Sequence, residues 1–212
     1  MKTEHLKNVL CRHEMPKSPS VRIFEPASVL MLLYEKDGEA CLLAVRKADT
    51  EGYPWRNQVA LPGGRVDGSD DSPLAAAYRE VKEELDIDAS EIEMVGSLGY
   101  FQTIRQTEIE TFVGFWKGDG ASLRFDPREI SATLEIPLDD LIKTHVESNY
   151  MGRRPDIATL LYPAGTNSGK LSDCGDIVVW GVTAVMLHFF LEHLRTVSPE
   201  SFDGILKKQS FL

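Results

Sequence analysis

Three glutamates in the middle of the chain have the residue type and the spacing to hold a divalent metal ion. With residues 72–85 placed on a helix at about 100° per residue, Glu80, Glu83 and Glu84 share an arc of about 100°. Crowded carboxylates repel one another unless a cation offsets their charge, and oxygen ligands of this kind suit Mg²⁺ or Mn²⁺. A solvated acidic helix face is the alternative interpretation of the same pattern.

The surroundings of the glutamates favour the metal site. The pair Gly63-Gly64 precedes the helix by a short acidic loop. Glycine permits backbone conformations that other residues resist, so the main-chain carbonyl of Gly64 could approach the same ion. Arg79 lies four residues before Glu83, close enough to pair with it and hold its rotamer. These residues therefore predict a metal site made of Gly64 and the three carboxylates, with Arg79 beside it.

The helix that carries the glutamates has recognisable start and core signals. Ser72 followed by Pro73 is typical of an N-cap with proline at the first helical position. The stripe beside the carboxylates is apolar and consists of Leu74, Ala77, Val81 and Leu85. We therefore expect the helix to pack through this stripe and to present its carboxylates next to it.

Strand-like runs on both sides of this helix provide a scaffold. We expect strands at residues 27–34, 40–46, 92–101, 108–116, 130–135 and 159–162. Helices are expected at residues 3–12 and 137–143, with a final amphipathic helix at 180–194. Residues 47–60 and 65–71 are polar and are expected to be loops. The pattern predicts an α+β fold in which a mixed sheet lies between helices.

Composition and charge narrow the functional classes. The net charge of −10 argues against a protein that grips a nucleic acid through its phosphates. Three widely spaced cysteines without a CxxC motif argue against a disulfide framework or a zinc site. On the final helix, His188 and His193 are interpreted as ordinary packed or exposed side chains rather than ligands. The longest apolar stretch is too interrupted to span a bilayer, so we expect a soluble, cytoplasmic protein with no membrane partner.

The chain is long enough for one sizeable core. We expect a helix and link at residues 1–26, a single domain at 27–196, and an extension at 197–212 that packs on this domain. Residues 144–175 are long for a connection in a compact domain and are interpreted as either a substrate lid or a dimer contact. A monomer and a homodimer both remain open.

The segments from Gly64 to Asp70 and from Arg79 to Ile87 resemble the Nudix box, G-x5-E-x7-R-E-U-x-E-E-x-G-U, in which U is aliphatic. The resemblance implies an α/β/α sandwich and hydrolysis of a nucleoside diphosphate linked to another moiety. It further implies that Glu80, Glu83 and Glu84 ligand Mg²⁺ or Mn²⁺ and that Arg79 orients them. The sequence departs from the motif because Asp70 replaces glutamate, eight rather than seven residues separate it from Arg79, and Asp86 replaces glycine.

Within this family the chain is similar to the coenzyme A pyrophosphatase branch. Residues 62–70 match the pattern P-G-G-[KR]-x-D-x-x-D, and residues 177–184 resemble I-W-G-x-T-A. Asn57 and Leu61 replace a glycine and a phenylalanine of the branch, and residues 47–56 lack its basic and histidine pattern. The similarity implies cleavage of coenzyme A or an acyl-CoA to 4′-phosphopantetheine and adenosine 3′,5′-bisphosphate. ADP-ribose, a dinucleotide or a nucleoside triphosphate are the alternative substrates.

The general base is expected from a carboxylate outside the helix. Glu129 precedes a predicted strand where the family often places a further carboxylate, and the alternative is an ordinary surface acid. Glu108 and Glu110 are reserve candidates.

Three arginines are candidates for binding the substrate. Arg46, Arg56 and Arg65 could contact its phosphates, because guanidinium matches phosphate oxygens in a bidentate manner. For Arg65, an ion pair with Asp67 is the alternative interpretation.

A nucleotide sensor without catalytic activity and a hydrolase of RNA caps are the two alternative functional classes. A Nudix-like module that senses a nucleotide without cleaving it need not keep Arg79 and three helix carboxylates, so their presence favours an enzyme that acts on a small nucleotide. A hydrolase of RNA caps is disfavoured by the acidic balance and the lack of a basic tail.

Overall fold

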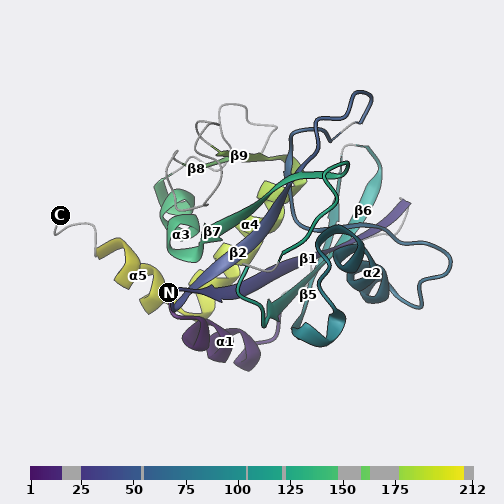
Figure 1. Ribbon diagram of the computed structural model, residues 1–212. Helices are drawn as coiled ribbons and strands as arrows, with labels where there is room; N and C mark the ends of the chain where they lie inside the picture. Colours follow the sequence, from purple (N-terminus) through teal and green to yellow (C-terminus); the bar gives the residue numbers. More distant parts are fainter. Residues whose placement is uncertain are drawn as a thin grey trace.

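The computed structural model describes residues 1–15, 25–53, 55–103, 105–120, 123–147, 159–162 and 177–207. Within these residues, seven strands form one mixed sheet (Figure 1). Its strands are β1 (Glu25–Lys36), β2 (Glu39–Lys47), β3 (Val59–Ala60), β4 (Gly63–Arg65), β5 (Ile92–Gln102), β6 (Thr107–Trp116) and β7 (Ile130–Pro137). The order β3-β2-β1-β6-β5 forms the main path, with β4 paired to β1 and β7 paired to β2. Strands β1 and β6 are parallel, and the other pairs are antiparallel.

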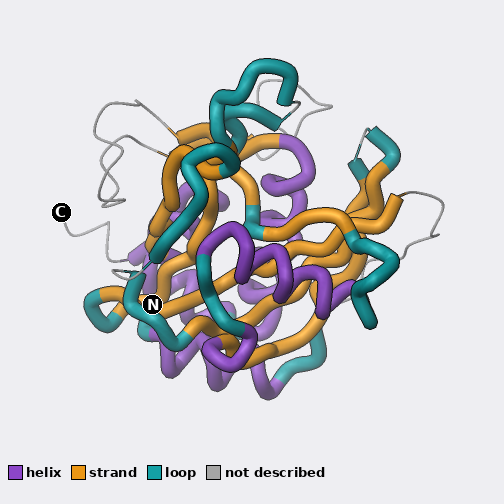
Figure 2. Tube along the Cα trace, turned by 45° about the vertical axis from the view of Figure 1, so that its right-hand side comes forward, coloured by secondary structure: helices purple, strands orange, loops and turns teal. Residues whose placement is uncertain are grey.

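Helices cover both faces of this sheet (Figures 1 and 2). They are α1 (Thr3–Arg12), α2 (Pro73–Leu85), α3 (Leu138–Glu147), α4 (Gly181–Val197) and α5 (Pro199–Lys207), with a 3₁₀ turn at Ala89–Glu91. Strands β8 (Thr159–Tyr162) and β9 (Ile177–Trp180) form a separate antiparallel pair. The predicted α+β sandwich with a mixed sheet is therefore confirmed.

The central strand β1 shows why both faces need cover. Met31 and Leu33 belong to a core cluster that includes buried residues of α1, α3, α4 and α5. Leu30 and Leu32 belong to a second cluster, on the opposite face, that includes Ala77, Val81 and Leu85 of α2. Since successive side chains of a strand point to opposite faces, a strand covered on both sides is apolar throughout. The apolar stripe predicted for α2 is the one that packs.

Most expected elements are present with shifted ends, and two corrections concern the type of an element. Residues 47–60 and 65–71 were expected to be loops, but they contribute β3 and part of β4, which form by pairing with β2 and β1. Residues 177–180 form strand β9, so the last long helix begins at Gly181 and continues to Val197. The expected helix at 137–143 begins at Leu138 and continues to Glu147. These short strands depend on tertiary pairing rather than on local propensity.

The two terminal helices bury side chains in the same core cluster. Leu6 and Leu10 of α1 and Phe202 and Ile205 of α5 are all buried there. The division at residues 26 and 196 stays a prediction. The lid or dimer contact expected at residues 144–175 lies outside the described residues, apart from 144–147 and 159–162. Among the described helices, none has the length and apolarity needed to span a membrane.

Candidate active site

A cavity of about 530 Å³ lies where α2, strands β1 and β4, and the segments that follow β2 and precede β7 meet. Its volume is in the range typical of pockets for small ligands. Acidic, basic and aromatic side chains share its lining. They include Glu80, Glu84, Glu129, Lys47, Arg65, Arg128, Tyr53 and Trp55, with Val29, Ile109 and Val182 as apolar walls.

Helix α2 is fixed at both ends by its own sequence. The Oγ atom of Ser72 accepts a hydrogen bond from the backbone N–H of Ala75 at 3.1 Å, and Pro73 occupies the first turn. At the other end Asp86 is left-handed, with φ of 57°, and its N–H donates to the carbonyl of Lys82. Aspartate tolerates this conformation better than most residues, so it can replace the glycine of the motif. Asn57, which also stands in place of a glycine, has φ of 59°.

Glu80 lies against the main chain of Gly64. A Cβ atom added to Gly64 would collide with the carboxylate of Glu80, so only glycine allows this contact. Burial raises the pKa of Glu80, and the hydrogen bond from Arg79 opposes that rise. A cation at this position could be stabilised by the carboxylate of Glu80 and by the main-chain carbonyl of Gly64.

Glu84 is almost completely buried, with 2% of its surface exposed. Its carboxylate accepts hydrogen bonds from the ammonium group of Lys47 and from the backbone N–H of Gly63, the latter at 3.0 Å. Burial raises the pKa of Glu84, whereas Lys47 and Gly63 lower it. Lys47 was not predicted as a site residue, because it was expected to lie in a polar loop. The signal that could have found it is a lysine directly after an apolar strand.

Arg79 joins the acidic groups into one network. Its Nε and Nη2 atoms each donate to the carboxylate of Asp70 at 3.0 Å. Its Nη1 atom donates to Glu80 at 2.9 Å and to Glu83 at 3.3 Å. The contact expected between Arg79 and Glu83 is thus present. The longer loop before α2 still lets Asp70 reach the arginine.

The structure brings some of the predicted residues to the cavity and leaves others outside. Glu80, Glu84, Gly64, Glu129 and Arg65 line it. Glu83 is not part of the lining; 58% of its side chain is exposed, and its carboxylate pairs with Arg79. The reserve acids Glu108 and Glu110 are also outside the lining.

Two of the three predicted arginines, Arg46 and Arg56, do not line the cavity, and their contact with substrate phosphate stays a prediction. Neighbouring residues of a strand point to opposite faces, and at the end of β2 it is Lys47 that faces α2. Arg56 lies 3.7 Å from Asp49, and both side chains are more than half exposed.

Arg65 remains a candidate for contact with substrate phosphate, but its partner differs from the one expected. It pairs with Glu25 at 3.2 Å. Asp67, which was its expected partner, lies 3.8 Å from Arg79 instead.

Two aromatic side chains that line the cavity were not among the predicted site residues. Tyr53 and Trp55 pack edge to face with ring centroids 5.6 Å apart, and 40% of Trp55 is exposed. An exposed tryptophan at a cavity mouth offers a flat apolar surface to a planar ligand. The sequence signal that could have identified them is the presence of two aromatic residues within one polar loop.

The glycine that begins β4 gives a stability prediction. Gly63 has φ of 143°, and a Cβ atom there would lie 2.6 Å from Cα of Val29. We expect Gly63→Ala to lower the free energy of unfolding by about 1–3 kcal/mol, because backbone strain adds to the collision. Chemical denaturation would measure the change. Gly68→Ala is the matched control, because nothing lies within 4 Å of a Cβ atom at Gly68. Equal stabilities of the two variants would contradict the explanation.

Comparison with known proteins gives one family match. The model of the NUDIX domain matches residues 25–154. Among curated proteins, the chain is 31% identical to "Uncharacterized Nudix hydrolase NudL" of Escherichia coli K12, over 74% of this chain and 77% of that protein. It is 27% identical to "Nudix hydrolase 22, chloroplastic" of Arabidopsis thaliana, over 76% of this chain and 52% of that protein. The match thus spans about half the length of the plant relative. Among solved structures, RenU, a Nudix hydrolase from M. smegmatis, is 18% identical with a TM-score of 0.47, over 61% of this chain and 81% of that one.

Proposed function

The chain belongs to the Nudix domain family, and we propose that its cavity beside α2 is the active site of a metal-dependent pyrophosphohydrolase. The proposed reaction is cleavage of the diphosphate in a nucleoside diphosphate derivative. The observation that carries the proposal is the meeting of Glu80, Glu84 and the main chain of Gly64 in one cavity of about 530 Å³. Such a cavity combines ligands for a cation with a volume that can hold a small substrate.

The donor set fits a divalent cation with hard oxygen ligands. Glu80, Glu83 and Glu84 with the carbonyl of Gly64 would hold Mg²⁺ or Mn²⁺. The fit rests on the bare backbone of Gly64 against Glu80 and on two partly or fully buried carboxylates, Glu80 and Glu84, that line the same cavity. When bound, the metal neutralises phosphate charge, polarises the P–O bond and acidifies a water molecule.

The residues around the carboxylates have separate roles in this proposal. Arg79 positions Glu80 and Glu83 through the hydrogen bonds of its Nη1 atom. Arg65 would contact the phosphates of the substrate. Glu129 would accept the proton of the attacking water. Its loop is held by a hydrogen bond from the N–H of Ala48 to the Glu129 carbonyl at 2.8 Å.

Coenzyme A or an acyl-CoA is the substrate we propose. The support is the sequence pattern at residues 62–70 and 177–184, together with a cavity that has both a charged side and an aromatic one. An adenine ring could stack on Trp55, since stacking on aromatic side chains contributes about 1–3 kcal/mol per base. The products would be 4′-phosphopantetheine and adenosine 3′,5′-bisphosphate.

Product analysis by mass spectrometry tests the proposal. Purified protein would be incubated with coenzyme A, ADP-ribose, NADH, diadenosine polyphosphates and nucleoside triphosphates, each with Mg²⁺ or Mn²⁺. We expect coenzyme A to be cleaved only when metal is present. Cleavage of another substrate would retain the hydrolase and reject coenzyme A. Ligand-dependent stabilisation without cleavage of any compound would favour a sensing module instead.

Glu129→Gln tests the proposed base. We expect turnover to fall by about 10²-fold or more, because loss of a positioned general base typically removes 10²–10⁴-fold. Steady-state kinetics with the substrate identified above would measure the change. Glu51→Gln, an exposed acid in a loop near the cavity, is the matched control and should leave turnover unchanged. Turnover of Glu129→Gln within a few-fold of the wild type would remove Glu129 from the mechanism.

A further inference from the structure

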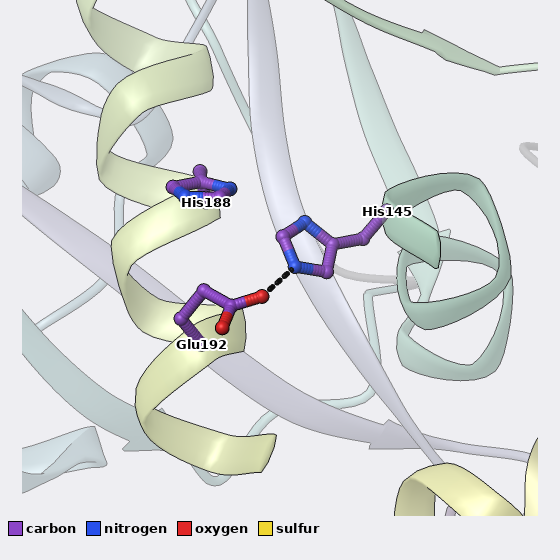
Figure 3. Close-up of side chains that lie close together, drawn as sticks. All are labelled: His145, His188 and Glu192. Carbon is purple, nitrogen blue, oxygen red and sulfur yellow. Dashed lines mark hydrogen bonds and ion pairs between the residues drawn. The ribbon is translucent and has the colours of Figure 1, made fainter. Parts of the chain in front are cut away.

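A second cluster of possible metal ligands lies between α3 and α4 (Figure 3). His145 of α3 faces His188 and Glu192 of α4, and one ligand atom from each lies within 4.8 Å of the others. The Nε2 atom of His145 is 2.7 Å from Oε1 of Glu192. The ring centroids of the two histidines are 4.9 Å apart. None of these residues lines the cavity beside α2.

The spacing on α4 places His188 beside a carboxylate of the same helix. Glu192 follows His188 by four positions, so both side chains lie on one face of the helix. The third group, His145, comes from a distant part of the sequence and could not be paired with them from the chain alone. Only 4% of the His145 side chain is exposed. The fold therefore gathers a donor set that local sequence does not show.

We propose that His145, His188 and Glu192 bind one zinc ion that ties α3 to α4. Two imidazole nitrogens and a carboxylate oxygen are ligands that zinc accepts at about 2.0–2.2 Å, with a water molecule in the fourth position. Ligand atoms already within 4.8 Å of one another need only small side-chain rotations to reach such a geometry.

The ring nitrogens of the cluster leave room for an ion among the described residues. The Nε2 atom of His145 contacts the carboxylate of Glu192, and the two imidazole rings lie side by side. The Nδ1 atom of His145 is buried and has no hydrogen-bond partner in the described part of the chain. Buried polar atoms usually have a partner, and a bound ion would supply one.

The proposed ion would hold together segments that are far apart in the sequence. His145 and Glu192 are 47 positions apart. A clip that closes a long loop restricts the unfolded chain, and an ion that binds only the folded chain stabilises it. The helix it fixes also carries Val182, which lines the cavity beside α2. The site would therefore connect the two helices, and it is separate from the proposed catalytic carboxylates.

Zinc binding to the full chain tests this proposal. Chelator-treated protein would be dialysed against Zn²⁺ at micromolar concentration, and bound zinc would be measured by elemental analysis. We expect one zinc per wild-type chain and a higher melting temperature with zinc than without it. His188→Gln and Glu192→Gln should each weaken binding at least about tenfold. Their melting temperatures without zinc show whether each variant is folded.

Two controls separate this site from other metal binding. His193→Gln alters another half-buried histidine of α4 and should retain the zinc. Glu83→Gln alters a proposed catalytic carboxylate and should retain it as well. Co²⁺ in the wild type gives a readout without substitution, because nitrogen ligands and a low coordination number produce strong visible absorption. Wild-type affinity in both His188→Gln and Glu192→Gln, loss of the zinc in Glu83→Gln, or no zinc in the wild type would each overturn the proposal.

Discussion

Glu80→Gln is expected to lower turnover by on the order of 10³-fold while the fold is kept. The carboxylate of Glu80 lies against the main chain of Gly64 and lines the cavity, so two of the proposed metal ligands lie side by side there. A metal ion contributes several kcal/mol to stabilisation of a phosphoryl-transfer transition state, and each 1.4 kcal/mol corresponds to about tenfold in rate. Glutamine keeps the size of the side chain and removes its charge. The loss should therefore appear in turnover rather than in folding.

Single-turnover and steady-state kinetics at saturating Mg²⁺ or Mn²⁺ would measure this loss. Asp86→Asn is the matched control, because it also removes one negative charge from the end of α2 and asparagine tolerates the same left-handed conformation. Its turnover should stay within about twofold of the wild type, as is usual for an exposed surface charge. If both variants lost activity equally, general electrostatics rather than metal ligation would explain the effect.

The sequence was sufficient to predict helix α2 and the contact between Arg79 and Glu83. Ser72, Pro73 and the apolar stripe are local signals, and a local signal can be interpreted without knowledge of the fold. The departures from the motif also have a local explanation. Asp86 and Asn57 replace glycines in left-handed conformations that these two residue types tolerate. Substitutions of this kind change the residue types of a motif and keep its backbone conformation.

The sequence was insufficient wherever a side chain depends on distant partners. Lys47 reaches Glu84 because side chains of β2 and α2 belong to one core cluster, and the two residues are 37 positions apart in the sequence. The exposure of Glu83 could not be predicted either. Helical spacing shows that the three glutamates lie on one side of α2, but it does not show which of them a neighbouring loop covers. His145 meets Glu192 only because α3 and α4 share a face of the sheet. Periodicity predicts elements, whereas the contacts between elements determine which charges meet.

Lys47→Met is expected to lower the free energy of unfolding of the metal-free protein by about 3–5 kcal/mol, as is typical when one partner of a buried ion pair is removed. Glu84 is 2% exposed and would keep the N–H of Gly63 as its remaining hydrogen-bond donor among those described. Methionine retains much of the apolar stem of lysine, so lost packing is a smaller effect. For a chain of this length, the melting temperature should fall by on the order of 10 °C.

A double-mutant cycle separates the charge effect from packing. In Lys47→Met combined with Glu84→Gln, no buried charge is left unpaired, so most of the stability should return. The proposed metal site adds a second expectation. Mn²⁺ should raise the melting temperature of Lys47→Met more than that of the wild type, because a cation at Glu84 would replace the missing ammonium group. Additive losses in the cycle would show that Lys47 acts through packing alone. Equal stabilisation by Mn²⁺ would place the metal away from Glu84 and restrict the proposed ligand set to Glu80, Glu83 and Gly64.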